Sequence, residues 1–174
     1  MKMLFASDIH GSLSDMETLL KRIKEEKPDF IMFLGDFCGY SENEIFGEAF
    51  GKITVPYSYL RGNCDNGEVL TRHGLCAEAY TCVEKFGEKR VFGTHGHLYI
   101  YGGLPVGMEK GDIFVSGHTH VPVIFYRDGI TVINCGSMAR PRMSETKTYA
   151  CIEGNKAYIK NGETGEIVKE AEII

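Results

Sequence analysis

The sequence predicts an α/β fold in which a mostly parallel sheet is followed by a second sheet of paired strands. Two observations carry this prediction. Strand and helix patterns alternate as far as residue 60, and beyond residue 75 short strands come in pairs around turn residues. Because no linker rich in Pro, Ser or charge separates the two halves, we expect the 174 residues to form a single domain, 1–174.

The first half contains three strand candidates with helices between them. Each strand candidate is an apolar run of strand length, and the three runs are residues 3–7, 29–34 and 53–60. Between the first two, apolar residues recur at helical spacing, with Ser14 as the expected N-cap and Pro28 as the end. A second, short helix is expected at residues 42–50. This alternation is typical of right-handed crossovers in a parallel sheet that is buried on both faces.

The second half reads as strands joined by tight turns. Turn residues such as Gly87-Glu88 and Gly154-Asn155 separate alternating strand patterns, as they do in β-hairpins. The expected pairs are residues 80–86 with 89–94, 121–126 with 130–134, and 148–153 with 157–160. A further strand is expected at residues 112–116. We therefore expect a second sheet that packs on the first.

The composition is that of an ordinary globular protein without a basic stripe. Hydrophobic residues make up 43% and charged residues 25%, and the formal net charge is -5. Bulk nucleic acid is therefore disfavoured as a partner. The longest purely apolar run, residues 30–34, is far below the roughly 20 residues that span a bilayer. Residues 1–11 lack the apolar stretch of a signal peptide. We expect a cytoplasmic protein with no membrane partner, whose six cysteines are free thiols.

Polar residues with metal-ligand chemistry follow the predicted strands. Of six histidines, five lie in Asp-x-His or His-x-His tripeptides, and the sixth, His73, is expected in a surface loop. The residues just past strand ends are Asp8, His10, Asp36, Asn63, His95, His118 and His120. Open α/β sheets bind ligands at this edge because their loops converge there. Seven oxygen and nitrogen donors exceed the needs of one ion and suit two ions that share a bridging ligand.

These residues belong to five ordered motifs, namely Asp8-Ile9-His10, Gly35-Asp36, Gly62-Asn63-Cys64-Asp65, His95-Gly96-His97 and Gly117-His118-Thr119-His120. In this order they resemble the motifs of the calcineurin-like metallophosphoesterases, and the resemblance covers the whole chain. The compact length and the Asn134-Cys135-Gly136-Ser137 segment followed by Pro141-Arg142 resemble the small bacterial and archaeal phosphodiesterases. The resemblance implies a sandwich of two mixed β-sheets flanked by helices.

The resemblance also implies a dinuclear metal centre that hydrolyses phosphodiesters. The implied ligands are Asp8, His10 and His120 for one ion, Asn63, His95 and His118 for the other, and Asp36 as the bridge. Two divalent cations generate a bridging hydroxide near neutral pH, and this hydroxide attacks phosphorus in line with the leaving oxygen. Imidazole ligands favour Mn, Fe, Zn or Ni over Ca, and within the family we expect manganese.

The sequence departs from the family pattern at the residue after Gly62-Asn63. Many members carry a histidine there that protonates the leaving alkoxide, whereas this chain has Cys64. A thiol, with a reference pKa of about 8.5, is a poorer proton donor than an imidazolium. We therefore expect a preference for good leaving groups and for diesters over monoesters. Asp65 and His97 are alternative proton donors or groups that orient Cys64, and for His97 we favour a hydrogen bond to a metal ligand.

Three residues are candidates for lining the substrate cleft, namely Tyr40, Arg61 and Arg142. The two guanidinium groups suit bidentate contacts to phosphate. The expected partner is a small phosphodiester, and the strand-rich last third offers sheet edges that a homo-oligomer would cover. Two other functions remain open. One is a protein-interaction scaffold that resembles the retromer metallophosphoesterase-like subunit, with weak or no activity, and the other is a broad phosphomonoesterase.

Overall fold

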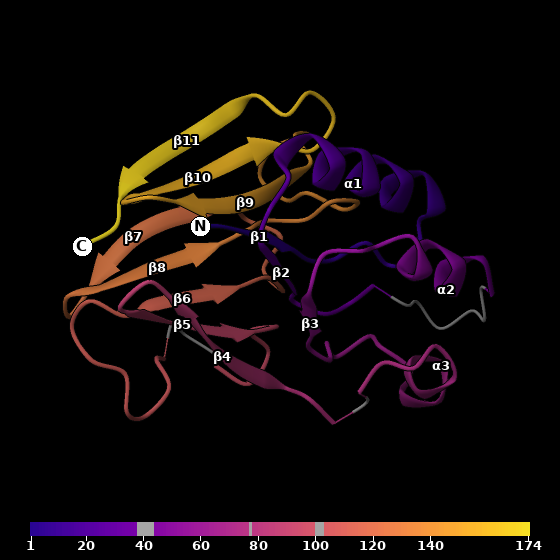
Figure 1. Cartoon of the computed structure of the whole chain (residues 1–174), viewed down its shortest axis with the longest axis horizontal. Helices are drawn as coiled ribbons and strands as arrows, with labels where there is room; N and C mark the ends of the chain where they lie inside the picture. The colour runs from indigo at the N-terminus through magenta and orange to yellow at the C-terminus, as the bar shows by residue number, and fades with distance from the viewer. Residues whose placement is uncertain (38–43, 77, 100–102) are drawn as a thin grey trace.

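The computed structural model describes residues 1–37, 44–76, 78–99 and 103–174, and there the chain forms two β-sheets with helices beside them (Figure 1). The first sheet has the strand order β11 (Ile167–Glu172), β10 (Lys156–Asn161), β9 (Thr148–Glu153), β1 (Lys2–Ala6), β2 (Phe30–Phe33), β3 (Tyr57–Tyr59). The second has the order β4 (Thr81–Phe86), β5 (Lys89–Thr94), β6 (Ile113–Ser116), β8 (Ile130–Asn134), β7 (Val123–Arg127). The helices are α1 (Leu13–Glu26), α2 (Glu44–Gly51) and α3 (Gly67–Arg72).

Both sheets are mixed, so the predicted α/β sandwich of two mixed sheets flanked by helices is confirmed. Strands β1, β2 and β3 are parallel, and so are β5, β6 and β8, while the remaining strands run antiparallel to their neighbours. All three predicted hairpins form. The last hairpin does not join the second sheet, because β9 pairs with β1. The end of the chain therefore completes the sheet that its first residues begin.

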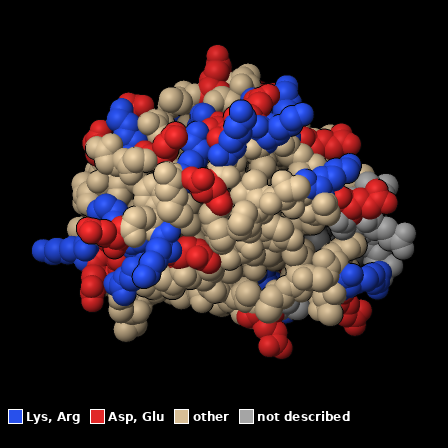
Figure 2. All heavy atoms as spheres, in the orientation of Figure 1, with Lys and Arg blue, Asp and Glu red and all other residues tan. Residues whose placement is uncertain are grey.

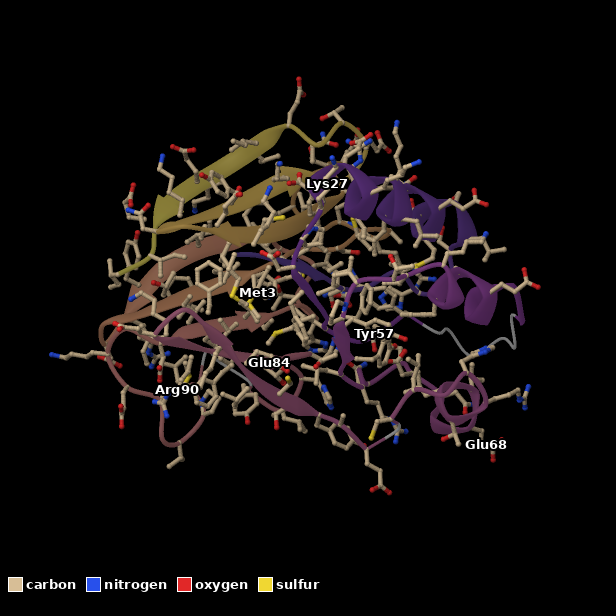
Figure 3. The ribbon with its side chains drawn as sticks, in the orientation of Figure 1. Met3, Lys27, Tyr57, Glu68, Glu84 and Arg90 are labelled. Carbon is tan, nitrogen blue, oxygen red and sulfur yellow. The ribbon has the colours of Figure 1, made fainter. Side chains whose placement is uncertain are left out.

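Strands β1 and β2 of the first sheet are buried on both faces, as the continuous apolar runs predict. Met3 and Phe5 of β1 lie in the core between the two sheets, and Met3 is labelled there in Figure 3. Leu4 and Ala6 of the same strand face the opposite way, into the core that the sheet shares with the helices. Successive side chains of a strand point to opposite faces, so a strand covered on both sides needs apolar residues at every position.

Helix α1 begins two residues earlier than predicted. Its N-cap is Ser12 and not Ser14, because Met16 N already donates to Ser12 O at 3.0 Å. Ser12 N in turn donates to Ile9 O, so a tight turn directly after β1 starts the helix. The predicted end is correct, since Lys27 takes the left-handed C-cap conformation with φ 49° and Pro28 follows.

The strand expected at residues 53–60 is shorter than predicted, and two elements form where none was predicted. Strand β3 covers only Tyr57–Tyr59, because Pro56 has no N–H to donate to a ladder. Ile53 and Val55 pack against the helix-side core from outside the strand. The six-residue helix α3 and the edge strand β11 were not expected, and β11 is polar and largely exposed, which hides the strand pattern.

The outer face of the second sheet is covered by a loop. Tyr99, Leu104 and Met108, from the segment between β5 and β6, pack against Phe114 and Val132 of the sheet. The face shown in Figure 2 carries positive and negative side chains interspersed around a broad uncharged area. No helix in the described part of the chain has the length and apolar character needed to span a bilayer.

Candidate metal centre

Strand ends bring the predicted polar residues to one edge of the molecule. Asp8 comes just after β1 and Asp36 just after β2, while His95 and His118 come just after β5 and β6. Backbone hydrogen bonds join these loops, since Asp8 N donates to Gly35 O at 3.1 Å and Gly117 N donates to His95 O at 3.0 Å. The carboxyl ends of the parallel strands in both sheets therefore contribute to one site.

Five of the seven predicted metal ligands have a left-handed backbone. Their φ angles lie between 50° and 64°, and the residues are Asp8, His10, Asp36, His118 and His120. In the described ranges only Lys27, Asp128 and Met143 share this feature among residues other than glycine. Such conformations cost free energy and concentrate at functional sites. Their gathering at this edge supports a functional site independently of the side chains.

The ligand atoms form two clusters with one carboxylate between them. In the first, Asp8 Oδ1 lies 3.0 Å from His120 Nε2 and 3.6 Å from His10 Nε2. In the second, His95 Nε2 lies 3.3 Å from Asp36 Oδ2 and 3.0 Å from Asn63 Oδ1. Asp36 Oδ2 is also 3.9 Å from His10 Nε2, so this carboxylate is within reach of both clusters.

Backbone carbonyls fix the orientation of two of these imidazole rings. His95 Nδ1 is 2.7 Å from Leu34 O, and His120 Nδ1 is 2.5 Å from Arg140 O. A carbonyl oxygen only accepts, so each Nδ1 donates its proton and Nε2 faces the carboxylates. Asp8 raises the pKa of His120 and, although burial opposes it, Asp36 raises the pKa of His95, so a bound cation would take the place of the Nε2 proton that these carboxylates favour. Asp8 Oδ1 is buried among these atoms without a hydrogen-bond partner. This donor set fits divalent cations, whose imidazole ligands usually donate their other N–H to a carbonyl.

The charges at the site favour the metal-binding forms of the carboxylates. Burial opposes ionisation of Asp8, but contacts with His10 and His120 outweigh it and hold the pKa of this carboxyl below its usual range. Burial also opposes ionisation of Asp36, and His95 lowers the pKa of that carboxyl on balance. Both groups are therefore ionised at neutral pH, as metal coordination requires.

Two motif glycines are needed because the loops cross at close range. A Cβ atom on Gly62 would lie 2.0 Å from Asp36 Oδ1, and one on Gly117 would lie 2.1 Å from Ser7 Oγ. Neither position has room for a side chain. The Gly-Asn and Gly-His motifs therefore reflect how tightly the loops pack against the carboxylates.

Asp65 and Cys64 both hold Asp36. The buried Asp65 Oδ2 accepts hydrogen bonds from Asp36 N at 2.9 Å, Gly62 N at 2.8 Å and Tyr59 Oη at 2.9 Å, which ties the two loops together. Cys64 N donates to Asp36 Oδ1 at 2.8 Å. Burial, together with Asp36, raises the pKa of the Cys64 thiol to about 11, so the thiol keeps its proton at neutral pH.

His118 and His97 pack beside His95. The ring centroid of His95 lies 5.0 Å from that of His118 and 5.4 Å from that of His97. Burial and the neighbouring His95 lower the pKa of both His97 and His118, which keeps both rings neutral. His97 Nδ1 is buried without a hydrogen-bond partner. His118 therefore lies within the predicted site, and His97 contacts two of the predicted ligands.

The structure describes two of the three predicted substrate residues, and these two lie in different surroundings. Arg142 lines a pocket of about 400 Å³ together with His10, Asp36 and Cys64, and Arg140, which sequence reasoning missed, lines it as well. Arg61 lies over the ring of Tyr80, with its guanidinium carbon 5.8 Å from the ring centroid. Tyr40 lies outside the described residues. The pocket thus sets two arginines beside the candidate ligands.

Sequence reasoning also missed the support that the loop after β8 gives to the site. Ser137 Oγ donates to Asp8 O at 2.8 Å, and Asn134 Nδ2 donates to Gly117 O at 2.6 Å. Cys135, between them, is buried in the core between the sheets. The Asn-Cys-Gly-Ser motif at residues 134–137 signals this loop, which holds the backbones that carry Asp8 and His118.

The fold and these ligand clusters define a metal-dependent phosphoesterase. Residues 1–157 match the calcineurin-like phosphoesterase superfamily domain, and the chain belongs to this family. It is 30% identical over 167 residues to phosphodiesterase YfcE of Escherichia coli (strain K12), with 89% of each chain covered. It is also 30% identical over 162 residues to the probable metallophosphoesterase YsnB of Bacillus subtilis (strain 168), with 87% of this chain and 83% of the relative covered.

Solved structures show the same fold. The structure of YfcE, described as a phosphoesterase from E. coli, matches with a TM-score of 0.90 and 27% identity over 100% of both chains. Vps29 from Entamoeba histolytica, complexed with zinc, matches with a TM-score of 0.72 and 19% identity over 100% of both chains. The second likeness concerns the fold alone. Family membership implies a divalent metal cofactor, which the acceptor clusters fit.

Proposed function

We propose that the protein is a phosphodiesterase with a dinuclear metal centre. The ligands in this proposal are Asp8, His10 and His120 for one ion, Asn63, His95 and His118 for the other, and Asp36 for both. The observation that carries it is the position of Asp36 Oδ2, which lies 3.3 Å from His95 Nε2 and 3.9 Å from His10 Nε2. A carboxylate between two ligand clusters is the arrangement that two-metal hydrolysis requires.

The chain's own residues would orient the ligands and the substrate. The Leu34 and Arg140 carbonyls fix the His95 and His120 rings through their Nδ1 protons. Cys64 N–H holds Asp36 Oδ1, which leaves Oδ2 facing the imidazoles. Arg140 and Arg142 line the pocket and offer guanidinium groups to phosphate oxygens. Bound cations would supply an activated water and neutralise charge on the phosphoryl oxygens.

Manganese is the ion that we propose. The proposed ligand set combines imidazole nitrogens with carboxylate and amide oxygens. This mixture suits Mn, Fe, Zn or Ni better than Ca. Adding each ion to chelated protein and measuring hydrolysis would rank them, and a protein active only with Ca would contradict the assignment.

Diesters are the proposed substrates. The relative YfcE, at 30% identity, is named a phosphodiesterase. The Cys64 thiol holds its proton too tightly to serve a poor leaving group near neutral pH. A monoester also brings one more negative charge to a site whose candidate ligands already include the carboxylates of Asp8 and Asp36.

Hydrolysis of bis(p-nitrophenyl) phosphate, with manganese and after chelation, tests the proposal. We expect metal-dependent turnover and a loss of at least about 100-fold in Asp36→Asn, which removes the shared carboxylate. Asp128→Asn is the matched control, because Asp128 has the same left-handed backbone in an exposed turn. No turnover with any of the four metals would instead favour the scaffold function, and faster hydrolysis of p-nitrophenyl phosphate would favour the phosphomonoesterase.

A further inference from the structure

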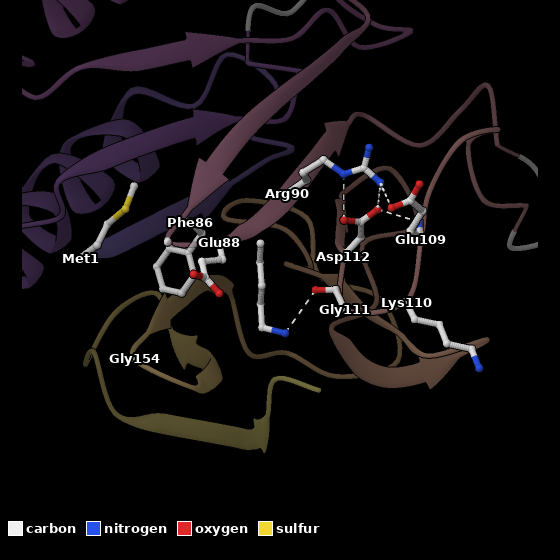
Figure 4. Close-up of a pocket in the computed structure, with 11 residues that line it drawn as sticks. Met1, Phe86, Glu88, Arg90, Glu109, Lys110, Gly111, Asp112 and Gly154 are labelled. Atoms are coloured by element: carbon white, nitrogen blue, oxygen red, sulfur yellow. Dashed lines mark hydrogen bonds and ion pairs between the residues drawn. The ribbon is translucent and has the colours of Figure 1, made fainter.

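A pocket of about 660 Å³ lies at the end of the molecule opposite the metal centre (Figure 4). It opens where β5 and β6 begin, whereas the metal ligands follow the ends of these strands. Two of its three basic side chains are engaged within the protein, because Arg90 pairs with Asp112 at 2.6 Å and Lys89 Nζ donates to Gly111 O at 3.3 Å. The third, Lys110, would be a single lysine beside the carboxylates of Glu88, Glu109 and Asp112, which is a poor setting for an anion.

A second pocket, of about 480 Å³, lies on the outer face of the second sheet. Phe114 of β6, Val132 of β8 and Phe125 of β7 form its floor, and Tyr99 and Leu104 belong to the loop beside it. Pockets for small organic ligands typically have volumes of about 300–1,000 Å³ and mostly apolar walls. Both the size and the lining of this pocket suit a ring-sized organic group.

His118 joins this pocket to the proposed metal centre. The loop residues Gly117, His118 and Thr119 line the apolar pocket, and His118 also lines the pocket that contains Asp36 and Asn63. The two pockets therefore meet at His118, which places apolar space next to one of the proposed metal ligands.

The polar groups in this pocket are largely used within the protein. Asn134 Nδ2 donates to Ser116 Oγ at 3.2 Å and to Gly117 O at 2.6 Å, while Asn134 Oδ1 accepts from Gly136 N. Thr119 Oγ1 accepts from Val121 N at 3.2 Å. A bound ring would thus be recognised by apolar burial and by contact with aromatic faces, with little hydrogen-bond selection.

We propose that this apolar pocket binds an aromatic ring on the ester group that stays attached to the phosphate. The assignment rests on the proposed function. The resemblance to the family places the leaving oxygen beside Cys64, and Cys64 lines the other pocket with His10 and Asp36. The pocket beyond His118 is therefore assigned to the retained group. The substrate class is a phosphodiester with at least one aromatic ester group, and the identity of the ring matters little.

Two diesters with the same leaving group test this inference, namely methyl p-nitrophenyl phosphate and phenyl p-nitrophenyl phosphate. We expect kcat/KM to be at least about tenfold higher for the phenyl diester, since apolar pockets discriminate by this order. Phe125→Ala removes an aromatic ring from the pocket floor and should lower the phenyl-to-methyl ratio, and Val123→Trp, which fills the pocket, should lower it further. Comparing ratios between variants cancels the intrinsic reactivity of the two substrates.

Tyr126→Ala is the matched control. Tyr126 follows Phe125 on β7 and has a similar exposure, 46% against 43%, but it does not line the pocket. Its phenyl-to-methyl ratio should equal that of the unmodified protein. If both diesters are hydrolysed and all variants share one ratio, the pocket assignment is wrong while the proposed function stands.

Equilibrium binding separates the two proposals. The probes are phenylphosphonate and methylphosphonate, whose C–P bonds this chemistry leaves intact, and calorimetry gives their Kd values. We expect phenylphosphonate to bind at least about tenfold more tightly, with the difference lost in Phe125→Ala and kept in Tyr126→Ala. Equal Kd values would overturn the inference. Absence of hydrolysis with this binding preference intact would overturn only the proposed function.

Discussion

At the scale of single residues, the site depends on how Asp36 is held. Its N–H donates to Asp65, its Oδ1 accepts from Cys64 N, and the backbone of Gly62 packs against the same oxygen. These contacts fix a residue whose backbone is left-handed and therefore costly. The carboxylate that we assign to both ions is thus positioned by its neighbours before any ion binds.

Gly62→Ala should damage both stability and activity. The added Cβ would lie 2.0 Å from Asp36 Oδ1 and 2.5 Å from Asp36 N, so the loops must separate. We expect a loss of about 2–4 kcal/mol in the free energy of unfolding, measured by urea denaturation, together with a large fall in diesterase activity. Gly51→Ala, where the Cβ meets nothing within 4 Å, should leave both nearly unchanged. Equal stability of the two variants would mean that the loops do not pack as described.

Cys64→His should raise activity toward monoesters more than toward diesters. An imidazolium near neutral pH can protonate a poor leaving group, whereas the Cys64 thiol, with its pKa raised to about 11 by burial and Asp36, donates poorly. General acid catalysis of this kind is typically worth about 10²–10⁴-fold, so a gain of at least about tenfold on phenyl phosphate is expected. Steady-state kinetics on phenyl phosphate and bis(p-nitrophenyl) phosphate measure it. Unchanged monoester activity would remove the leaving-group argument.

Motif residues were predictable, but the groups that support them were not. Asp8, Asp36 and His118 follow strand ends in order along the chain, which the sequence displays directly. Ser137 donates to Asp8 O from 129 residues away, and the Arg140 carbonyl bonds His120 across 20 residues. Contacts between residues so far apart in the sequence depend on the tertiary fold, and no local sequence pattern predicts them. The position of Arg140 in the pocket could not be predicted for the same reason, because only the fold brings this residue there.

At the scale of elements, the end of α1 is fixed to the first sheet by a charged cluster around Glu26. Glu26 lies at the last position of the helix, and its carboxylate pairs with Lys160 of β10, accepts from Tyr149 of β9 at 2.8 Å and pairs with Lys2 of β1 at 3.1 Å. The Glu26 side chain is only 9% exposed. Three strands of one sheet therefore hold the same helix end.

Glu26→Gln should destabilise the protein by about 1–3 kcal/mol at pH 7, because two lysines lose a partly buried partner. Burial opposes ionisation of Glu26, but Lys160, Tyr149 and Lys2 outweigh it and lower the pKa of this carboxyl. A lowered folded-state pKa contributes stability above the unfolded value of about 4.3, and this stability is lost as pH falls below it.

The stability difference between Glu26→Gln and the unmodified protein should therefore shrink below about pH 4. Urea denaturation at several pH values measures this difference. Glu17→Gln on the exposed face of the same helix is the control, and it should change stability little at any pH. A constant difference across pH 3 to 7 would show that the charge of Glu26 is not what stabilises the helix end.

Elements with strong periodicity were predictable, and weak ones were not. The hairpin strands β5, β8 and β9 have the predicted bounds, because turn residues and alternating side chains mark both of their ends. Strand β11 reads as Ile-Val-Lys-Glu-Ala-Glu and has mostly exposed side chains, so its pairing with β10 and its contact with Tyr126 of β7 decide its conformation. Helix α3 has only six residues, which is too short for a helical pattern to be read.

At the scale of the whole molecule, each proposed ion would connect the two sheets. Asp8 and His10 follow β1 of the first sheet, whereas His120 follows β6 of the second. Asn63 likewise follows β3, and His95 follows β5 of the other sheet. The sheets already share one apolar core, which supports the expectation of a single domain over residues 1–174. The metal centre would add a polar link at one edge of that core.

Metal removal should therefore lower the melting temperature of the whole protein. An ion that binds only the folded state at 100 times its Kd adds about 2.7 kcal/mol. In a protein of this size each kcal/mol shifts Tm by about 2–4 °C, so adding manganese to chelated protein should raise Tm by about 5–10 °C. Asp36→Asn should lose most of this shift, while Asp128→Asn should retain it. Differential scanning calorimetry measures both. Because ligands from both sheets must separate on unfolding, the transition should move as a single peak, and a shift confined to part of the transition would contradict a metal centre shared by the two sheets.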